Sequence, residues 1–91
     1  MITVNLDGKN VKDKEELHAF LKDQLKLPEW YGGNLDALFD CLTCELTEHV
    51  VIFLRNKELF PAQLGNYGSR FLQVLSDAEE ESPLLTISMV S

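Results

Sequence analysis

Three short segments of the chain have the hydrophobic pattern of β-strands. Residues 2–6 alternate apolar and polar side chains up to the turn pair Asp7-Gly8, and residues 84–90 alternate in the same way. Residues 50–54 are apolar at every position, which is typical of a strand covered on both faces in a parallel sheet. We therefore predict three strands, with residues 50–54 as the central one.

Two predicted helices separate the first strand from the central one. Apolar side chains recur at helical spacing over residues 14–26, which Asp13 caps at the start and Pro28 limits at the end. The same spacing recurs over residues 35–44, immediately after Asn34, a favourable N-cap residue. We therefore predict a pair of helices joined by a loop.

Two further helices are predicted between the central strand and the last one. A short helix over residues 57–64, ended by Gly65, is compatible with Pro61 only if this proline lies in the first turn. A longer helix over residues 68–81 ends before the pair Ser82-Pro83.

The element order β-α-α-β-α-α-β predicts an α/β fold, in which a small three-stranded parallel β-sheet packs against three to four α-helices. The 91 residues, of which 45% are hydrophobic and 25% charged, fit one domain over residues 1–91. The chain has neither an apolar run long enough to span a bilayer nor a basic and apolar leader. We therefore expect no membrane association, a cytoplasmic location and reduced cysteines.

The charged residues are unevenly distributed along the chain. The net charge is -7, and residues 27–54 hold five acids and no base, while residues 71–91 hold four acids and no base. This excess of acids argues against nucleic-acid binding, which depends on Lys and Arg, and favours a basic protein partner. Asp36 and Asp40 are four residues apart and share one face of the predicted helix, which Thr43 continues.

The acid pair has two interpretations. A solvated helix face is the ordinary one, and a partner-binding surface is favoured by Trp30 and Tyr31 in the glycine-containing loop just before the helix. One of these two aromatic residues can equally belong to the core. Glycoside hydrolysis needs two carboxyl groups facing each other across a cleft, which neighbours on one convex helix do not offer. No calcium-loop pattern is present, and we expect no metal, no cofactor and no enzymatic activity.

The spacing of Cys41 and Cys44 is C-x-x-C, which makes a dithiol redox protein the main alternative. Redox-active pairs lie at a helix N-terminus, whereas this pair falls late in the predicted helix, where Asp40 and Glu45 would raise the thiol pKa. We therefore expect buried or half-buried structural thiols. His18 and His49 have no nucleophile context, so we interpret both as structural or surface residues, and the acidic run 79–81 as a solvated helix end.

Residues 27–43 resemble the sequence signature of the barstar family, bacterial intracellular ribonuclease inhibitors, and weaker similarity extends over the whole chain. The residues that carry the resemblance are Leu27, Pro28, Trp30, Tyr31, Gly32, Asn34, Leu35, Asp36, Ala37, Leu38, Phe39, Asp40, Cys41 and Leu42. The resemblance implies a monomer that binds one basic ribonuclease and blocks its active site with the second helix and the loop before it, mimicking RNA.

The resemblance also assigns the binding residues. It implies that Asp40 occupies the phosphate position of the nuclease active site and that Asp36 meets a second cationic group. The rest of the contact would comprise Trp30, Tyr31, Gly32, Asn34, Leu35, Ala37, Thr43 and Asp77. Trp30 and Phe39 keep the aromatic character of the family pattern but replace a familiar tyrosine and tryptophan, and Gly33 and Glu45 depart from the pattern, which affects partner choice. An immunity or interaction module for a different basic toxin nuclease is therefore a further alternative.

Overall fold

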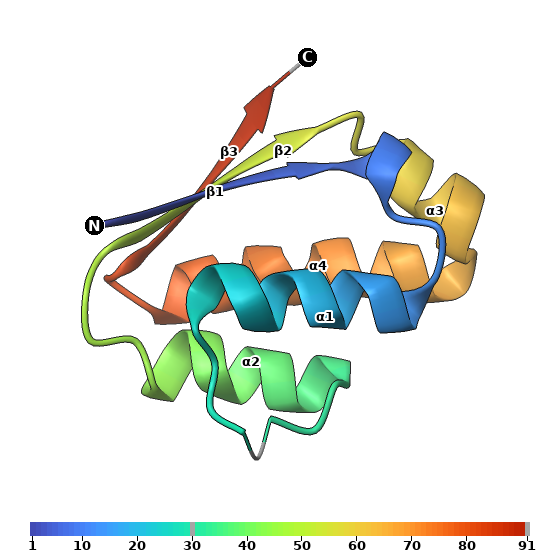
Figure 1. Cartoon of the computed structure of the whole chain (residues 1–91). Helices are drawn as coiled ribbons and strands as arrows, with labels where there is room; N and C mark the ends of the chain where they lie inside the picture. Colours follow the sequence, from blue (N-terminus) through green and yellow to red (C-terminus); the bar gives the residue numbers. More distant parts are fainter. Residues whose placement is uncertain (30, 91) are drawn as a thin grey trace.

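The computed structural model, which describes residues 1–29 and 31–90, contains one parallel sheet of three strands (Figure 1). The strands β1 (Ile2–Asp7), β2 (Val50–Arg55) and β3 (Leu85–Val90) are ordered β1-β2-β3. Ile2 is in register with Val50, which is in register with Leu85. The predicted parallel sheet with residues 50–54 at its centre is confirmed.

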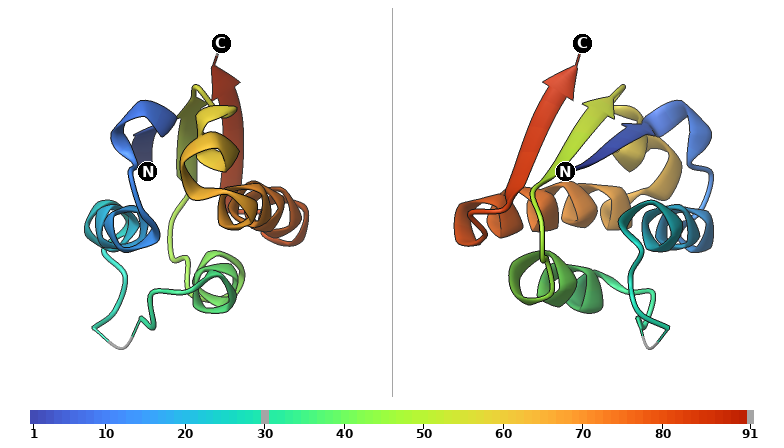
Figure 2. Two further views of the ribbon diagram at one scale, coloured as in Figure 1. Left: turned by 90° about the vertical axis from the view of Figure 1, so that its right-hand side faces the viewer. Right: turned by 60° about the vertical axis from the view of Figure 1, so that its left-hand side comes forward.

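The helices α1 (Lys14–Leu25), α2 (Leu35–Cys44), α3 (Leu59–Leu64) and α4 (Asn66–Glu81) connect the strands, and a 3-10 turn, Gly8–Asn10, follows β1. Figure 2 shows that α1, α2 and α4 lie on one side of the sheet. The predicted α/β fold with three to four helices is therefore confirmed, with four helices in the described residues. No helix in the described part of the chain is long and apolar enough to cross a membrane.

The prediction that β2 is covered on both faces is wrong. Val50, Ile52 and Leu54 are buried against the helices, but Val51 and Phe53 on the opposite face are only half-buried. Two right-handed crossovers that advance in the same direction across a sheet place their helices on the same face. The order β1-β2-β3 therefore leaves the other face without helical cover, which the apolar run alone did not indicate.

Local sequence signals set the helix ends. The side chain of Asp13 accepts a hydrogen bond from the backbone N–H of Glu16 at 2.8 Å, which confirms the predicted N-cap of α1. Lys26 ends this helix in the left-handed conformation, with φ of 53°, two residues before Pro28. Pro61 lies in the first turn of α3, as the predicted short helix requires.

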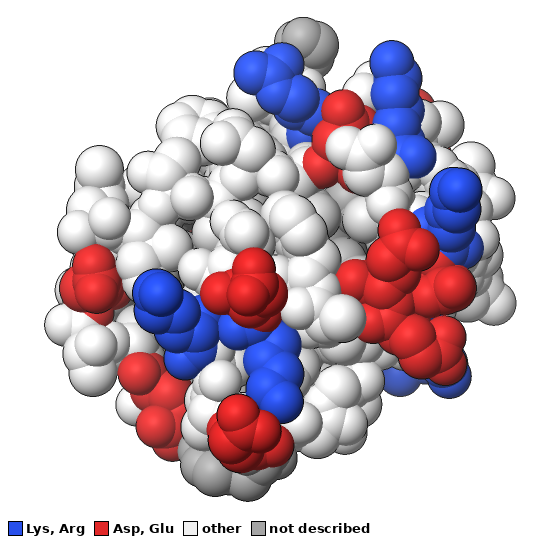
Figure 3. Space-filling model, viewed as in Figure 1, with Lys and Arg blue, Asp and Glu red and all other residues white. Residues whose placement is uncertain are grey.

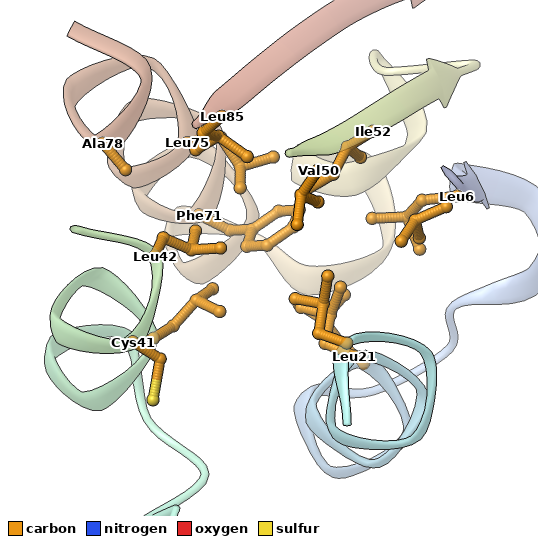
Figure 4. Packing of buried hydrophobic residues seen from close by; sticks show 14 of the residues in the cluster. Leu6, Leu21, Cys41, Leu42, Val50, Ile52, Phe71, Leu75, Ala78 and Leu85 are labelled. Atoms are coloured by element: carbon orange, nitrogen blue, oxygen red, sulfur yellow. The ribbon is translucent and has the colours of Figure 1, made fainter. Parts of the chain in front are cut away.

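Phe71 of α4 lies at the centre of the core, where the sheet and the helices meet. Figure 4 shows its ring between Val50 of β2, Leu42 of α2 and Leu21 of α1. All four side chains have no measurable solvent exposure. This shared core holds α2 in a fixed position relative to the sheet and to α4, so the outward face of α2 is also fixed.

Glu79 is not merely part of a solvated helix end, as the sequence suggested. Its carboxylate accepts a hydrogen bond from the backbone N–H of Ile87 at 2.6 Å. Because β3 is an edge strand, this N–H faces away from β2 and would otherwise need water as its acceptor. Glu79 therefore connects the end of α4 to the outer edge of the sheet.

Candidate functional site

The exposed face of α2 carries the two predicted carboxylates. Asn34 caps the helix, because its side-chain oxygen accepts a hydrogen bond from the backbone N–H of Ala37 at 2.8 Å. Leu38 faces the core, whereas Asp36 and Asp40 are exposed on the opposite side. This arrangement follows from helical periodicity, since residues four apart lie about 40° apart around the axis.

The carboxylates of Asp36 and Asp40 are available to an external ligand. Among the described residues, neither side chain forms an ion pair or accepts a hydrogen bond. The hydroxyl of Thr43, one turn beyond Asp40, donates to the carbonyl oxygen of Phe39 at 2.8 Å and is half-buried. The face therefore presents two acidic groups with a less accessible hydroxyl at its C-terminal end.

Helix α4 borders this face. In Figure 1, α2 and α4 run side by side in the same direction. Asp77 is exposed on the C-terminal half of α4, and its carboxylate accepts a hydrogen bond from the side chain of Gln73 at 2.9 Å. The exposed carboxylates of Asp36, Asp40 and Asp77, on these two adjacent helices, are together called the acidic surface below.

The acidic surface differs from the face over α1. Figure 3 shows that acidic and basic side chains are interspersed on that face. Helix α2, in contrast, contains Asp36 and Asp40 and no lysine or arginine. Mixed signs are the usual surface pattern of a soluble protein, and an acid-only helix favours the approach of positively charged groups.

Tyr31 anchors the loop before α2 in the protein interior. Its side chain is 8% exposed, and its hydroxyl is hydrogen-bonded to Nδ1 of His18, which is itself buried in α1. The other ring nitrogen of His18 is hydrogen-bonded to the hydroxyl of Tyr67 in α4. Three segments, the loop and two helices, thus meet at one buried imidazole.

The three residues of this network are uncharged at neutral pH. Burial lowers the pKa of His18 below its ordinary value of 6.5, and the nearby charge of Lys14 acts in the same direction. Burial raises the pKa values of Tyr31 and Tyr67. A neutral imidazole has one donor and one acceptor nitrogen, so one tyrosine hydroxyl donates to the ring and the other accepts from it.

The predicted contact residues differ in accessibility in the unbound chain. Gly32 and Asn34 are exposed and Ala37 is half-buried, whereas Tyr31 and Leu35 belong to the core. The second loop aromatic, Trp30, lies outside the described residues. The sequence left open which of the two aromatic residues packs inward, and the structure places Tyr31 there.

The two cysteines have different environments. Cys41 is fully buried, and burial, followed by the charges of Glu45 and Asp40, raises its pKa. This direction was predicted. Cys44 is exposed, so the expectation of a buried or half-buried thiol is wrong for this residue, because it lies on the outward side of α2 near Asp40. A thiol with a raised pKa is a poor nucleophile, which argues against dithiol catalysis.

Residues 1–29 and 31–90 contain no candidate metal site, because no three His, Cys, Asp or Glu side chains in this part of the chain are grouped to hold an ion. The histidines have structural and surface positions, as predicted: His18 is buried, and His49 is exposed, with Nε2 2.9 Å from the hydroxyl of Thr86.

The sequence interpretation missed two residues beside α2. Tyr67 completes the His18 network, and the exposed Arg70 of α4 lies near the start of α2. Tyr67 was assigned only to an apolar helical stripe, and Arg70 only to a charge count. No local signal connects either residue to α2, because more than 20 residues separate them along the chain.

Comparison with known proteins agrees with this geometry. The family described as Barstar (barnase inhibitor) matches residues 1–88 of the chain. A protein of Bacillus subtilis (strain 168) named "Putative ribonuclease inhibitor YrdF" is 41% identical over 81 residues, which cover 89% of each chain. The family match includes the loop, α2 and most of the sheet. The chain described here therefore belongs to the barstar family.

Proposed function

We propose that this chain is a ribonuclease inhibitor that acts in the cytoplasm as a monomer and binds one basic ribonuclease through the acidic surface and the loop before α2. Family membership and the name of the Bacillus subtilis relative support an inhibitor rather than an enzyme. The observation that carries the proposal is the exposed pair Asp36 and Asp40 on a helix without a base.

Asp40 is the central residue of the proposed contact. Its carboxylate is exposed and has no partner among the described residues, so the guanidinium or imidazolium groups of a nuclease active site would bind it directly. Such groups bind RNA phosphate during catalysis, and a carboxylate offers them a comparable anionic acceptor. Inhibition then results from occupation of the phosphate site without a bond that the nuclease can cleave.

The surrounding residues support this contact in different ways. Gly32, Asn34, Ala37 and Thr43 surround the carboxylates with small or uncharged groups that allow close approach. Tyr31 and Leu35 are in the core of the unbound chain, so their contribution is to hold the loop and the helix in place. Trp30, which precedes Tyr31, supplies the aromatic side chain of the contact in this proposal.

The test is inhibition of a small basic ribonuclease encoded by the source of the chain. We expect stoichiometric inhibition by the wild-type chain. Asp40→Ala should weaken inhibition by about 30-fold or more, corresponding to about 2 kcal/mol, because truncation leaves the desolvated cations of the nuclease unpaired. Glu80→Ala, which removes the same charge from an exposed position on α4, should cost less than about 3-fold.

Salt dependence gives a second measurement. Opposite charges on the two proteins accelerate encounter, so the association rate constant should fall as ionic strength rises. The dissociation rate constant should respond mainly to Asp40→Ala, since this group is covered in the complex. The proposal is wrong if the wild-type chain inhibits no basic ribonuclease of its own source, or if Asp40→Ala and Glu80→Ala have equal effects.

A further inference from the structure

Arg70 places a positive charge beside one end of the acidic surface. This exposed side chain comes from the N-terminal half of α4, which runs along the N-terminal half of α2 (Figure 1). A shallow depression of about 110 Å³ lies between the two helices. Its lining residues are Asn34, Leu35, Asp36, Tyr67 and Arg70.

The two carboxylates of α2 therefore have different electrostatic surroundings. Asp36 lies in the first turn, near the positive end of the helix dipole, and lines the same depression as Arg70. Asp40 lies one turn further along, beyond the useful range of the dipole, and the depression that contains Arg70 does not include it. Asp77 adds negative charge on the C-terminal half of α4, not beside Arg70.

The charge of Arg70 acts on its neighbours in the unbound chain. Burial raises the pKa of the half-buried Tyr67, and the charge of Arg70 acts on that pKa in the opposite direction without reversing the shift. Within the described part of the chain, Arg70 forms no ion pair with Asp36, so neither side chain is held in a fixed pair. The guanidinium is therefore an exposed positive charge on the side of the acidic surface where Asp36 lies, and it is not paired with that carboxylate.

We propose that Arg70 is a specificity-determining residue that competes with the partner for Asp36. Arg70 then reduces the contribution that a partner cation opposite Asp36 makes to binding, so partner cations opposite Asp40 provide most of the affinity. Two effects act in the same direction, because Arg70 offsets part of the field of Asp36 and also repels an approaching cation. A repulsive group of this kind gives specificity by weakening the binding of unsuitable partners. The inference rests on the proposed function and deepens it.

The experiment is a double-mutant cycle on Asp36 and Arg70, with inhibition of the basic ribonuclease from the chain's own source as the readout. Arg70→Ala alone should tighten inhibition by about 3- to 10-fold, because the competing charge is removed. Asp36→Ala should weaken inhibition by less than about 3-fold in the wild-type background, but by about 10-fold or more in the Arg70→Ala background. A larger loss of inhibition from Asp36→Ala when Arg70 is absent indicates that Arg70 and the partner compete for Asp36.

Arg55→Ala is the matched control. Arg55 is the exposed last residue of β2, and its removal changes the net charge by the same amount. Both views of Figure 2 show that this end of the strand points away from α2. Asp36→Ala should weaken inhibition by the same factor in the Arg55→Ala and wild-type backgrounds. This comparison separates a change in long-range attraction from the local effect of Arg70.

Two results would overturn the inference. In the first, Asp36→Ala weakens inhibition by the same factor with and without Arg70. In the second, Arg70→Ala inhibits more weakly than the wild-type chain, which would mean that Arg70 contacts an acidic group of the partner. Failure of the proposed function looks different, because then the wild-type chain does not inhibit the ribonuclease or Asp40→Ala inhibits it fully.

Discussion

The hydrogen bond between Tyr31 and His18 should contribute measurably to the stability of the fold. Tyr31 is 8% exposed and His18 is 4% exposed, so water has little access to either group. Tyr31→Phe keeps the ring but removes the hydroxyl, and it leaves a ring nitrogen of His18 without its partner. A lost buried hydrogen bond costs about 0.5–1.5 kcal/mol, and an unsatisfied buried group costs about 1–3 kcal/mol. We therefore expect the free energy of unfolding to fall by about 2 kcal/mol.

Urea denaturation followed by circular dichroism measures this change as a lower midpoint at constant slope. The melting temperature should fall by about 8–16 °C, given the usual 4–8 °C per kcal/mol for a domain of this size. Tyr67→Phe is the control, because Tyr67 is half-buried and water is able to replace its hydroxyl. This control should cost less than about 1 kcal/mol.

A double-mutant cycle with His18→Phe separates the hydrogen bond from other effects of the missing hydroxyl. In the His18→Phe background, Tyr31 has no imidazole to bond, so Tyr31→Phe should cost far less than in the wild type or become stabilising. The reasoning is refuted if Tyr31→Phe leaves the urea midpoint unchanged or if Tyr67→Phe lowers it more. It is also refuted if the losses of unfolding free energy caused by Tyr31→Phe and His18→Phe are additive in the double variant.

Three further predictions concern stability and thiol chemistry. Because the folded pKa of His18 is lowered below 6.5, the unfolded chain binds more protons than the folded chain as pH falls below 6.5, and stability should then decrease. The decrease should be smaller in His18→Gln, and a decrease of wild-type size in this variant would contradict the prediction. An aromatic disulfide reagent should label the exposed Cys44 in the native protein, and Cys41 only after unfolding; equal labelling rates would contradict the structure. Gly68→Ala should lower the free energy of unfolding by about 2 kcal/mol or more, because a Cβ there would lie 2.1 Å from a backbone oxygen of α3; a wild-type midpoint would argue against this close approach.

Local patterns were sufficient to predict the elements and the carboxylates that α2 exposes. Asn34 is a cap because its side chain reaches a backbone N–H three residues away, and Asp36 and Asp40 share a face because helical geometry repeats every 3.6 residues. These relations involve neighbours along the chain. They hold for any amphipathic helix with this sequence, whatever the helix packs against.

Packing between distant segments decided which face of β2 is covered and which way Tyr31 points. The hydrophobic pattern of β2 did not reveal that Phe53 lies on a face without helices, because this depends on the handedness and direction of both crossovers. Likewise, an aromatic residue in a glycine-containing loop is equally compatible with the core and with a binding surface. Tyr31 belongs to the core, and a histidine of α1 satisfies its buried hydroxyl.

The sequence by itself determined the strands, the helices, the family resemblance and the presence of two acids on one helix face. Only the tertiary structure placed His18 between two tyrosines and Arg70 beside Asp36. The physical reason is that hydrogen bonds and Coulomb interactions depend on distance in space, and these distances are set by how α1, α2 and α4 pack on the sheet.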